Sequence, residues 1–332
     1  MPRLVALVLV LLYATPGVAE TWRTETVGIL AGMDRLFRDA ETRSVKVRAN
    51  DRYFRISKSG DELTLLRSSG PAPQNRPEDA IPHSRIVSGS NDITTAWLAD
   101  GTDRYAHGVL GDTIEAASLK VRTATGKTAS FTVRSDSVLE DLIPRLVDVD
   151  GDGRDEIIVV RSHKDAGAAV VLLGLRGNRL VRLAESVAIG TSNRWLNPIG
   201  AADFDGDGQA EVAAVETPHI GGKLLLLKID GRRLREVGRY TGYSTHVIGS
   251  TELEMFAVTD INGDGAPEII LPTQDRMELR AISFAGGKLV VLAVAKLFRP
   301  VTTAILTEDV DGNGTPDILF GDQGGYLNII RR

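Results

Sequence analysis

Short apolar runs alternate with polar, glycine-rich turns along most of the chain. In the second half these runs hold three to six consecutive residues, which is typical of strands buried on both faces of a sheet. Turns such as Arg176-Gly-Asn178 and Asp230-Gly231 separate them. The pattern predicts an all-β protein with strands at residues 157–160, 169–173, 212–215, 223–228, 269–271, 278–283, 289–293, 318–320 and 326–330.

One kind of turn occurs four times. Nine-residue segments that begin at Asp148, Asp203, Asp260 and Asp309 align without gaps, and their starts are 55, 57 and 49 residues apart. The first reads Asp-Val-Asp-Gly-Asp-Gly-Arg-Asp-Glu, and the others keep its spacing of acids and glycines. A period near 50 residues is the size of a four-stranded propeller blade. We therefore predict a β-propeller of antiparallel, four-stranded blades.

The N-terminal part carries weaker copies of this unit. Residues 107–121 have the strand–loop–strand shape without most of the acids, so 101–142 is predicted to be a degenerate repeat without metal. Strand-like residues at 44–49, 53–57, 62–67 and 93–98 predict one further blade within 20–100, with a long loop at 68–82. We expect about six blades, with seven as the alternative, in a single domain over 20–332 whose Asp-rich repeats fill 143–332. An N-terminal strand is expected to complete a late blade and so protect its edge.

Composition narrows the class of protein. The chain has 332 residues, of which 42% are hydrophobic, enough for a large buried core. Its formal charge of -5 and its scattered basic residues argue against a nucleic-acid partner. There is no cysteine, which excludes disulfides and cysteine metal sites. The domain must therefore be held by its core and by whatever it binds.

The first 19 residues are predicted to be an export signal. Arg3 precedes an almost wholly apolar run at 4–14, and small residues around Ala19 suit cleavage after it. The run is too short to span a bilayer as a helix, although an N-terminal anchor is the alternative. No later apolar stretch is long enough to cross a membrane. We expect a periplasmic or secreted monomer with no membrane span in the mature chain.

The chemistry lies in the Asp-rich loops. Each places oxygen-bearing side chains at positions 1, 3, 5 and 9, and acids converging there would repel one another unless a cation lay between them. Calcium, which takes six to eight oxygen ligands in irregular geometry, fits better than magnesium. Glycines at positions 4 and 6 let the backbone fold around the ion, and position 7 would offer only its carbonyl. The predicted ligand positions are Asp148, Asp150, Asp152, Arg154 and Glu156; Asp203, Asp205, Asp207, Gln209 and Glu211; Asp260, Asn262, Asp264, Ala266 and Glu268; and Asp309, Asp311, Asn313, Thr315 and Asp317.

Two other interpretations of these loops compete. An EF-hand begins in the same way, but it needs a Glu at position 12 and flanking helices. Position 12 is Val159, Ala214, Leu271 or Phe320, each within a predicted strand, which argues against an EF-hand. The other alternative is an acidic turn that binds no metal, and four copies in register make it less favoured.

The repeat resembles a known family. The pattern Asp-x-Asp/Asn-Gly-Asp/Asn-Gly-x-x-Asp/Glu before an apolar strand is similar to the FG-GAP/VCBS repeats, over about residues 140–332. The resemblance implies a propeller with calcium in its hairpin loops, about four sites here. The Phe-Gly and Gly-Ala-Pro signatures are present only as fragments, Phe320-Gly321 and Gly200-Ala201. The family is functionally mixed, so the resemblance implies fold and metal more than activity.

No familiar catalytic constellation is recognisable. The histidines lack zinc-protease spacing, and there is no nucleophile elbow, phosphate-binding loop or cysteine nucleophile. We therefore expect a non-enzymatic binding or adhesion module for a protein or glycan. The alternative is an exported hydrolase or lyase, acting on polysaccharide or phosphoester in the central funnel. Loops before the innermost strands would supply the ligand face, or else pack between blades: Tyr105, His107, Arg145, Arg194, Trp195 and Arg299.

Overall fold

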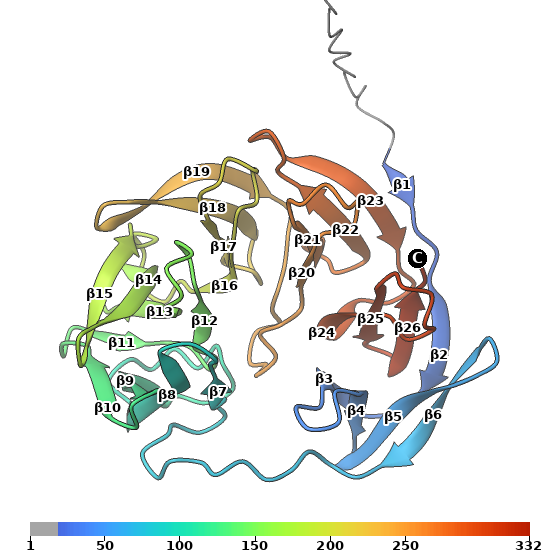
Figure 1. Cartoon of the computed structure of the whole chain (residues 1–332), viewed down its shortest axis with the longest axis horizontal. Coiled ribbons are helices and arrows are strands. Elements are labelled where there is room, and N and C mark those ends of the chain that lie inside the picture. The colour runs from blue at the N-terminus through green and yellow to red at the C-terminus, as the bar shows by residue number, and fades with distance from the viewer. Residues whose placement is uncertain (1–18) are drawn as a thin grey trace, which may run out of the picture.

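A computed structural model describes residues 19–332, and Figure 1 shows its strands standing in sets around a common centre. This part of the chain contains strands and no helix, so the predicted all-β class is confirmed. The described residues therefore include no helix that could cross a membrane. The predicted export signal, apart from Ala19, lies outside the described residues.

Each set is a run of consecutive antiparallel strands. The first two sets, in the N-terminal part, are β3 (Met33–Arg38), β4 (Val45–Ala49), β5 (Arg52–Ser59) and β6 (Glu62–Ser68), then β7 (Val87–Ser88), β8 (Ile93–Thr102), β9 (Glu115–Thr123) and β10 (Thr128–Thr132). The strands predicted at 44–49, 53–57, 62–67 and 93–98 are all present. The segment between β6 and β7 forms no strand, as expected from its proline and serine content.

The Asp-rich repeats form the remaining sets. Their strands are β12 (Arg145–Val147), β13 (Glu156–His163), β14 (Gly167–Arg176) and β15 (Arg179–Ser186); β16 (Leu196–Ala202), β17 (Glu211–Glu216), β18 (Lys223–Asp230) and β19 (Arg233–Thr241); β20 (Ala257–Thr259), β21 (Glu268–Pro272), β22 (Glu278–Ser283) and β23 (Val290–Lys296); and β24 (Val301–Glu308), β25 (Asp317–Asp322) and β26 (Tyr326–Ile330). The apolar pattern does not predict the outermost strands β15 and β19, because their side chains are largely polar and half exposed.

The N-terminus pairs with the C-terminal sets. Strand β2 (Glu25–Ile29) runs antiparallel to β26, and β1 (Glu20–Thr21) runs parallel to β23. The prediction that an N-terminal strand completes a late set is thereby confirmed. A strand from the start of the chain covers the edge that the last repeat would otherwise expose, and such edges are prone to pair with other chains.

Neighbouring sets are joined in one part of the ring. Short β11 (Ser137–Leu139) pairs with both β9 and β13, and the outer strands β15 and β19 meet in parallel at Glu185 and Arg233. Through these pairings the sets β7–β10, β12–β15 and β16–β19 form one continuous sheet. The Asp-rich loops at residues 148 and 203 therefore belong to adjacent, physically linked sets.

The core lies between the faces of adjacent sets. Strand β14 is buried along almost its whole length, and its neighbours contribute fully buried Ile158 and Val160 from β13 and Val212 and Ala214 from β17. Burying one such aliphatic side chain contributes about 1.5–3 kcal/mol. Small alanines at the contacts let the sheets approach closely. Because the strands on both sides of each Asp-rich loop are packed in this core, the two ends of the loop are held in place.

Candidate metal centres

Each Asp-rich loop joins the innermost strand of its set to the second strand. The loops connect β12 to β13, β16 to β17, β20 to β21 and β24 to β25. Position 12 of every loop lies inside the second strand, as the buried Val159 of β13 illustrates. Because strands and not helices flank the loops, the EF-hand alternative is excluded here.

The first residue of the loop organises its backbone. Asp148 accepts backbone N–H groups from Gly151 at 2.8 Å, Asp152 at 3.1 Å and Gly153 at 2.9 Å. The two glycines have φ values of 74° and 80°, a left-handed conformation that other residues adopt at a cost. The Asp-x-Asp-Gly-Asp-Gly sequence thus folds by Asx-type turns around one carboxylate. The bonds from the two glycines recur at Asp203, Asp260 and Asp309.

Position 9 supplies a buried acid at the start of the second strand. Glu156 is 2% exposed, and Glu211, Glu268 and Asp317 are 0% exposed. Each accepts the backbone N–H of position 2, for example Ile261 to Glu268 at 2.8 Å. Burial, with Asp150 and Asp152 close by, raises the pKa of Glu156 to about 7. A cation would relieve this crowding of acids.

Acidic side chains converge in three of the loops. Carboxylate oxygens of positions 1, 3 and 9 lie within 4.8 Å of one another in the trios Asp148–Asp150–Glu156, Asp203–Asp205–Glu211 and Asp309–Asp311–Asp317. These all-oxygen sets are the hard ligands that calcium prefers. The side chain at position 7 does not join these trios in the first loop. The Arg154 guanidinium there donates hydrogen bonds to Asp92 and to the Leu175 carbonyl.

Positions 3, 5 and 7 are occupied differently in the four loops. Position 3 of the third loop is Asn262, whose amide donates to Asp264 and Glu268 at 3.0 Å each. At position 5, Asp152, Asp264 and Asn313 each accept the backbone N–H of position 7, and Asp207 does the same with Gln209. At position 7, Ala266 is buried, whereas Thr315 and Gln209 lie toward the loop surface.

A lysine reaches into the second loop. The Nζ atom of Lys228, on β18, lies 3.0 Å from Asp205 Oδ2 and 3.3 Å from Glu211 Oε1, and it also contacts Asp207. Sequence reasoning missed this residue. The predicted strands at 212–215 and 223–228 were a partial signal, but only the register of the β17–β18 hairpin places Lys228 directly opposite Glu211.

Tyr105, His107 and Trp195, predicted for the ligand face, gather around Glu140. His107 Nδ1 lies 2.6 Å from Glu140 Oε1, and the indole N–H of Trp195 donates to the Glu140 carbonyl at 2.9 Å. The Tyr105 hydroxyl accepts the backbone N–H of Asn193 at 3.1 Å. Tyr105 and Trp195 are buried, at 4% and 1% exposure.

The structure separates the three arginines predicted for the ligand face. Arg145 pairs with Asp141 at 2.8 Å and donates to Asn197 at 3.0 Å, whereas Arg194 is exposed beside Trp195. Arg299 lies elsewhere, over the ring of Tyr326.

The centre of the ring holds a segment of the chain itself. Residues 244–256, between β19 and β20, run through the middle of Figure 1. The amide of Asn197 donates to the Leu253 carbonyl at 2.9 Å, and Gly249 N–H donates to Val109 O at 2.9 Å. Arg85 forms ion pairs with Glu252 and Glu254 of the segment. Because residues 244–256 contact several sets through these bonds, the segment holds the sets together at the centre of the ring.

Two grooves border the central segment at Glu252 and Glu254, and two others lie between sets β12–β15 and β16–β19. One, of about 890 Å³, is lined by Asp150 and Glu156 of the first loop together with Arg176, Arg182 and Arg232. A neighbouring groove of about 900 Å³ shares Arg182 and Arg232 with it.

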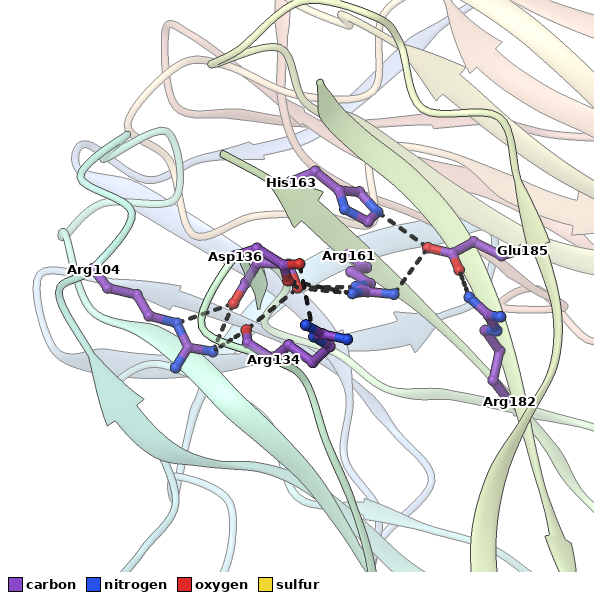
Figure 2. A network of polar contacts seen from close by, with 8 residues as sticks. Arg104, Arg134, Asp136, Arg161, His163, Arg182 and Glu185 are labelled. Carbon is purple, nitrogen blue, oxygen red and sulfur yellow. Dashed lines mark hydrogen bonds and ion pairs between the residues drawn. The ribbon is translucent and has the colours of Figure 1, made fainter. Parts of the chain in front are cut away.

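The polar network of Figure 2 borders the neighbouring groove. The Glu185 Oε1 atom lies 3.5 Å from Arg161 Nη1 and 3.2 Å from His163 Nε2. The same carboxylate also forms an ion pair with Arg182. Arg161 in turn donates to the Ser137 hydroxyl at 3.0 Å. The network ties β11, β13 and β15 together and sets arginine side chains along the groove wall.

The stability of the protein is expected to depend on pH through the buried acid Glu115, on β9. Burial, and then the nearby Glu140, Asp112 and Asp141, raise the pKa of Glu115 to about 9. The unfolded chain releases this proton near pH 4.5, so stability is lost as the pH rises from about 4.5 toward 9. We expect Glu115→Gln to flatten that decline and to gain at least about 1 kcal/mol at pH 8.5. Urea unfolding at pH 5.5, 7 and 8.5 measures this effect.

The matched control for that experiment is Glu62→Gln, at an exposed position of β6. It should keep the wild-type slope of stability against pH. If the stability of Glu115→Gln fell with pH as steeply as that of the wild type, Glu115 would be ionised in the folded protein and the prediction would be wrong.

Comparison with known families identifies the repeat. Residues 148–214, which include the first two Asp-rich loops, match the model of the FG-GAP-like repeat. Residues 148–214 therefore carry FG-GAP-like repeat sequence. The matched residues run from the first Asp-rich loop through β13, β14, β15 and β16 into β17, and the match confirms the resemblance drawn from the loops. None of the curated proteins compared matches the chain.

Several solved structures align with most of the chain at low identity. The WD40 domain of Toxoplasma gondii coronin aligns over 95% of this chain and 88% of its own, with a TM-score of 0.50 and 10% identity. A Photorhabdus luminescens Tc holotoxin pore aligns over 94% of this chain (TM-score 0.44, 14% identity), which spans only 14% of that chain. Regucalcin, a calcium-binding protein of Agrobacterium tumefaciens, aligns over 95% of both chains, with a TM-score of 0.41 and 11% identity. The WD40 likeness supports a propeller-like fold.

Proposed function

We propose that this protein is an exported propeller of six blades, stabilised by calcium, that serves as a non-enzymatic binding module for a protein or glycan. The observation that carries the proposal is the convergence of three acids in each of three equivalent loops. One such cluster is common on protein surfaces without an ion. Several in the same structural place, each with a buried acid at position 9, favour a shared metal function.

The six blades are the sets β3–β6, β7–β10, β12–β15, β16–β19, β20–β23 and β24–β26 with β2. The blade β7–β10 has only a short turn at residues 89–92 where the four C-terminal blades carry an Asp-rich loop, and residues 107–112 lie at the opposite end of β8. The family match and the WD40 likeness support the propeller architecture. Export rests on the N-terminal signal pattern.

Calcium would be held by the side chains of positions 1, 3, 5 and 9 and by the carbonyl of position 7. Bound there, it would neutralise the converging acids and fix each loop to its two strands. The first loop fits well, because Gly174 lies opposite Glu156 and brings no side chain into the loop. The fourth loop has Asp309, Asp311 and Asp317 together.

The groove beside the first loop is the proposed binding surface. Its wall combines Arg176, Arg182 and Arg232 with the loop acids Asp150 and Glu156. Arginines near a bound calcium ion would favour a ligand that carries carboxylate or sulfate groups. Two acids beside the predicted ligand-face residues, Glu115 and Glu140, are 2% and 0% exposed, which supports a structural role for these two side chains.

Chelation is expected to destabilise the protein. At a calcium concentration ten times Kd, each site adds about 1.4 kcal/mol to the free energy of unfolding. Removing calcium from several sites should lower Tm by at least about 5 °C. Thermal unfolding in excess calcium and in chelator measures the shift, and calorimetric titration counts the sites. We expect Asp148→Ala to reduce both the shift and the count.

The control for that variant is Asp230→Ala, an exposed turn aspartate outside the loops, with its side chain 69% exposed. It should keep the full calcium effect. If the wild-type protein melts at one temperature with and without chelator and binds no calcium, the loops are acidic turns and the proposal is wrong.

A further inference from the structure

The four Asp-rich loops differ in the residue that lies opposite position 9. In the first loop it is Gly174, and in the second it is Lys228. One residue beyond the paired positions, the third loop has Ser283 and the fourth has Arg331. The Arg331 guanidinium turns away to Glu25, at 3.0 Å, and its nearest loop oxygen, on Asp311, is 3.8 Å distant.

Lys228 behaves differently from Arg331. Its ammonium lies among the carboxylates of Asp205, Asp207 and Glu211, at 3.0 Å from the first and 3.3 Å from the last. These contacts come from positions 3, 5 and 9, three of the four side chains that would hold calcium. The side chain of Lys228 is only 17% exposed, so the ammonium is held within the loop.

The first two loops differ in this respect. The second loop has an internal counter-ion, the Lys228 ammonium, whereas the first loop has Gly174 at the equivalent place and no such charge opposite Glu156.

We infer that the second loop is closed by Lys228 in place of calcium, so that it stabilises its blade without metal. This inference rests on the proposed function, because it assigns calcium to the other loops and not to this one. A calcium ion sits 2.3–2.6 Å from its oxygen ligands, and an ammonium bound to the same oxygens would lie too close to that dication. Calcium could enter only if Lys228 left the loop.

The number of acids alone does not set this loop apart. The second loop has four acidic side chains, and the positive charge of Lys228 offsets one of them. Its net formal charge therefore equals that of the third and fourth loops, which have three acids each. The position of the ammonium among the prospective ligands is what excludes the ion. The lysine also lines the groove beside the first loop, where its charge would persist in the absence of calcium.

Calcium stoichiometry tests the inference in matched variants. Asp150→Ala and Asp205→Ala change position 3 of the first and second loops. We expect Asp150→Ala to bind one calcium ion fewer than the wild type. Asp205→Ala should bind the same number and should lower Tm equally in calcium and in chelator, because it removes an ion pair and no metal.

The decisive variant is Lys228→Met, which keeps the apolar stem and removes the charge. We expect it to bind one calcium ion more than the wild type, to melt lower than the wild type in chelator, and to regain stability in calcium. Lys228→Gln serves the same purpose if the methionine variant does not fold.

The outcomes separate this inference from the proposed function. Loss of one calcium ion in Asp205→Ala, or no gain in the Lys228 variants, would overturn the inference while calcium binding by the wild type upheld the function. If the wild type bound no calcium, the proposed function would fail. One ion gained by Lys228→Met would then still support the lysine closure.

Discussion

Replacing Trp195 by alanine is expected to lower the free energy of unfolding by about 3–5 kcal/mol, because it empties one of the largest buried sites in the protein. The side chain is 1% exposed, and its ring packs edge-on against His246 with centroids 4.8 Å apart. Its indole N–H donates to the Glu140 carbonyl, which would lose that partner. Urea unfolding of the variant measures the loss. Trp195→Phe should retain part of the packing and lose the hydrogen bond.

The adjacent residue provides the control. Arg194 is exposed, and its guanidinium donates only to the neighbouring Asn193 carbonyl. Arg194→Ala should stay within about 0.5 kcal/mol of the wild type. If Trp195→Ala were as stable as Arg194→Ala but bound ligand less well, Trp195 would belong to the ligand face after all.

Asn197→Asp is expected to cost at least about 3 kcal/mol, although it changes only one atom of the side chain. The amide of Asn197 donates to the Leu253 carbonyl at 2.9 Å and to the Thr245 hydroxyl at 3.1 Å. A carboxylate has no hydrogen to donate, so an ionised oxygen would face the Leu253 carbonyl in a site that is 0% exposed. Part of the cost is recovered by a stronger pair with Arg145. Because these bonds hold the central segment 244–256, its amides should also exchange hydrogen faster.

The same substitution at an exposed asparagine controls for the added charge. Asn178 lies in the turn between β14 and β15, and Asn178→Asp should change stability by no more than about 0.5 kcal/mol. Equal stabilities for the two variants would show that residues 244–256 are not fastened through Asn197.

Much of the fold could be predicted from local sequence. Apolar runs such as the one that became β14 are buried on both faces, so their composition reports strands directly. The spacing of Asp148 and Gly151 specifies a turn through bonds within one loop, and no distant residue is needed to form it. The outer strand β19 escaped prediction because one side of it faces solvent, so it has no continuous apolar run.

The ligand face could not be predicted in the same way. Tyr105, His107 and Trp195 meet around Glu140 only because three sets bring their loops together, and their burial is decided by what packs over them. The segment 244–256 has turn-like composition, and nothing local to it indicates that it fills the centre. Its place depends on Asn197, Val109 and Arg85, which are distant in sequence.

The sequence by itself therefore determined the all-β class, the repeated Asp-rich loops and the position of the acids within each loop, because these follow from contacts between residues close along the chain. Only the tertiary structure decided which charge enters each loop and which aromatic residues are buried. Lys228 lies 17 residues beyond Glu211, and the register of β17 with β18 brings its ammonium among the acids of the second loop. Side chains from separate strands meet through packing and register, which no single segment of the chain encodes.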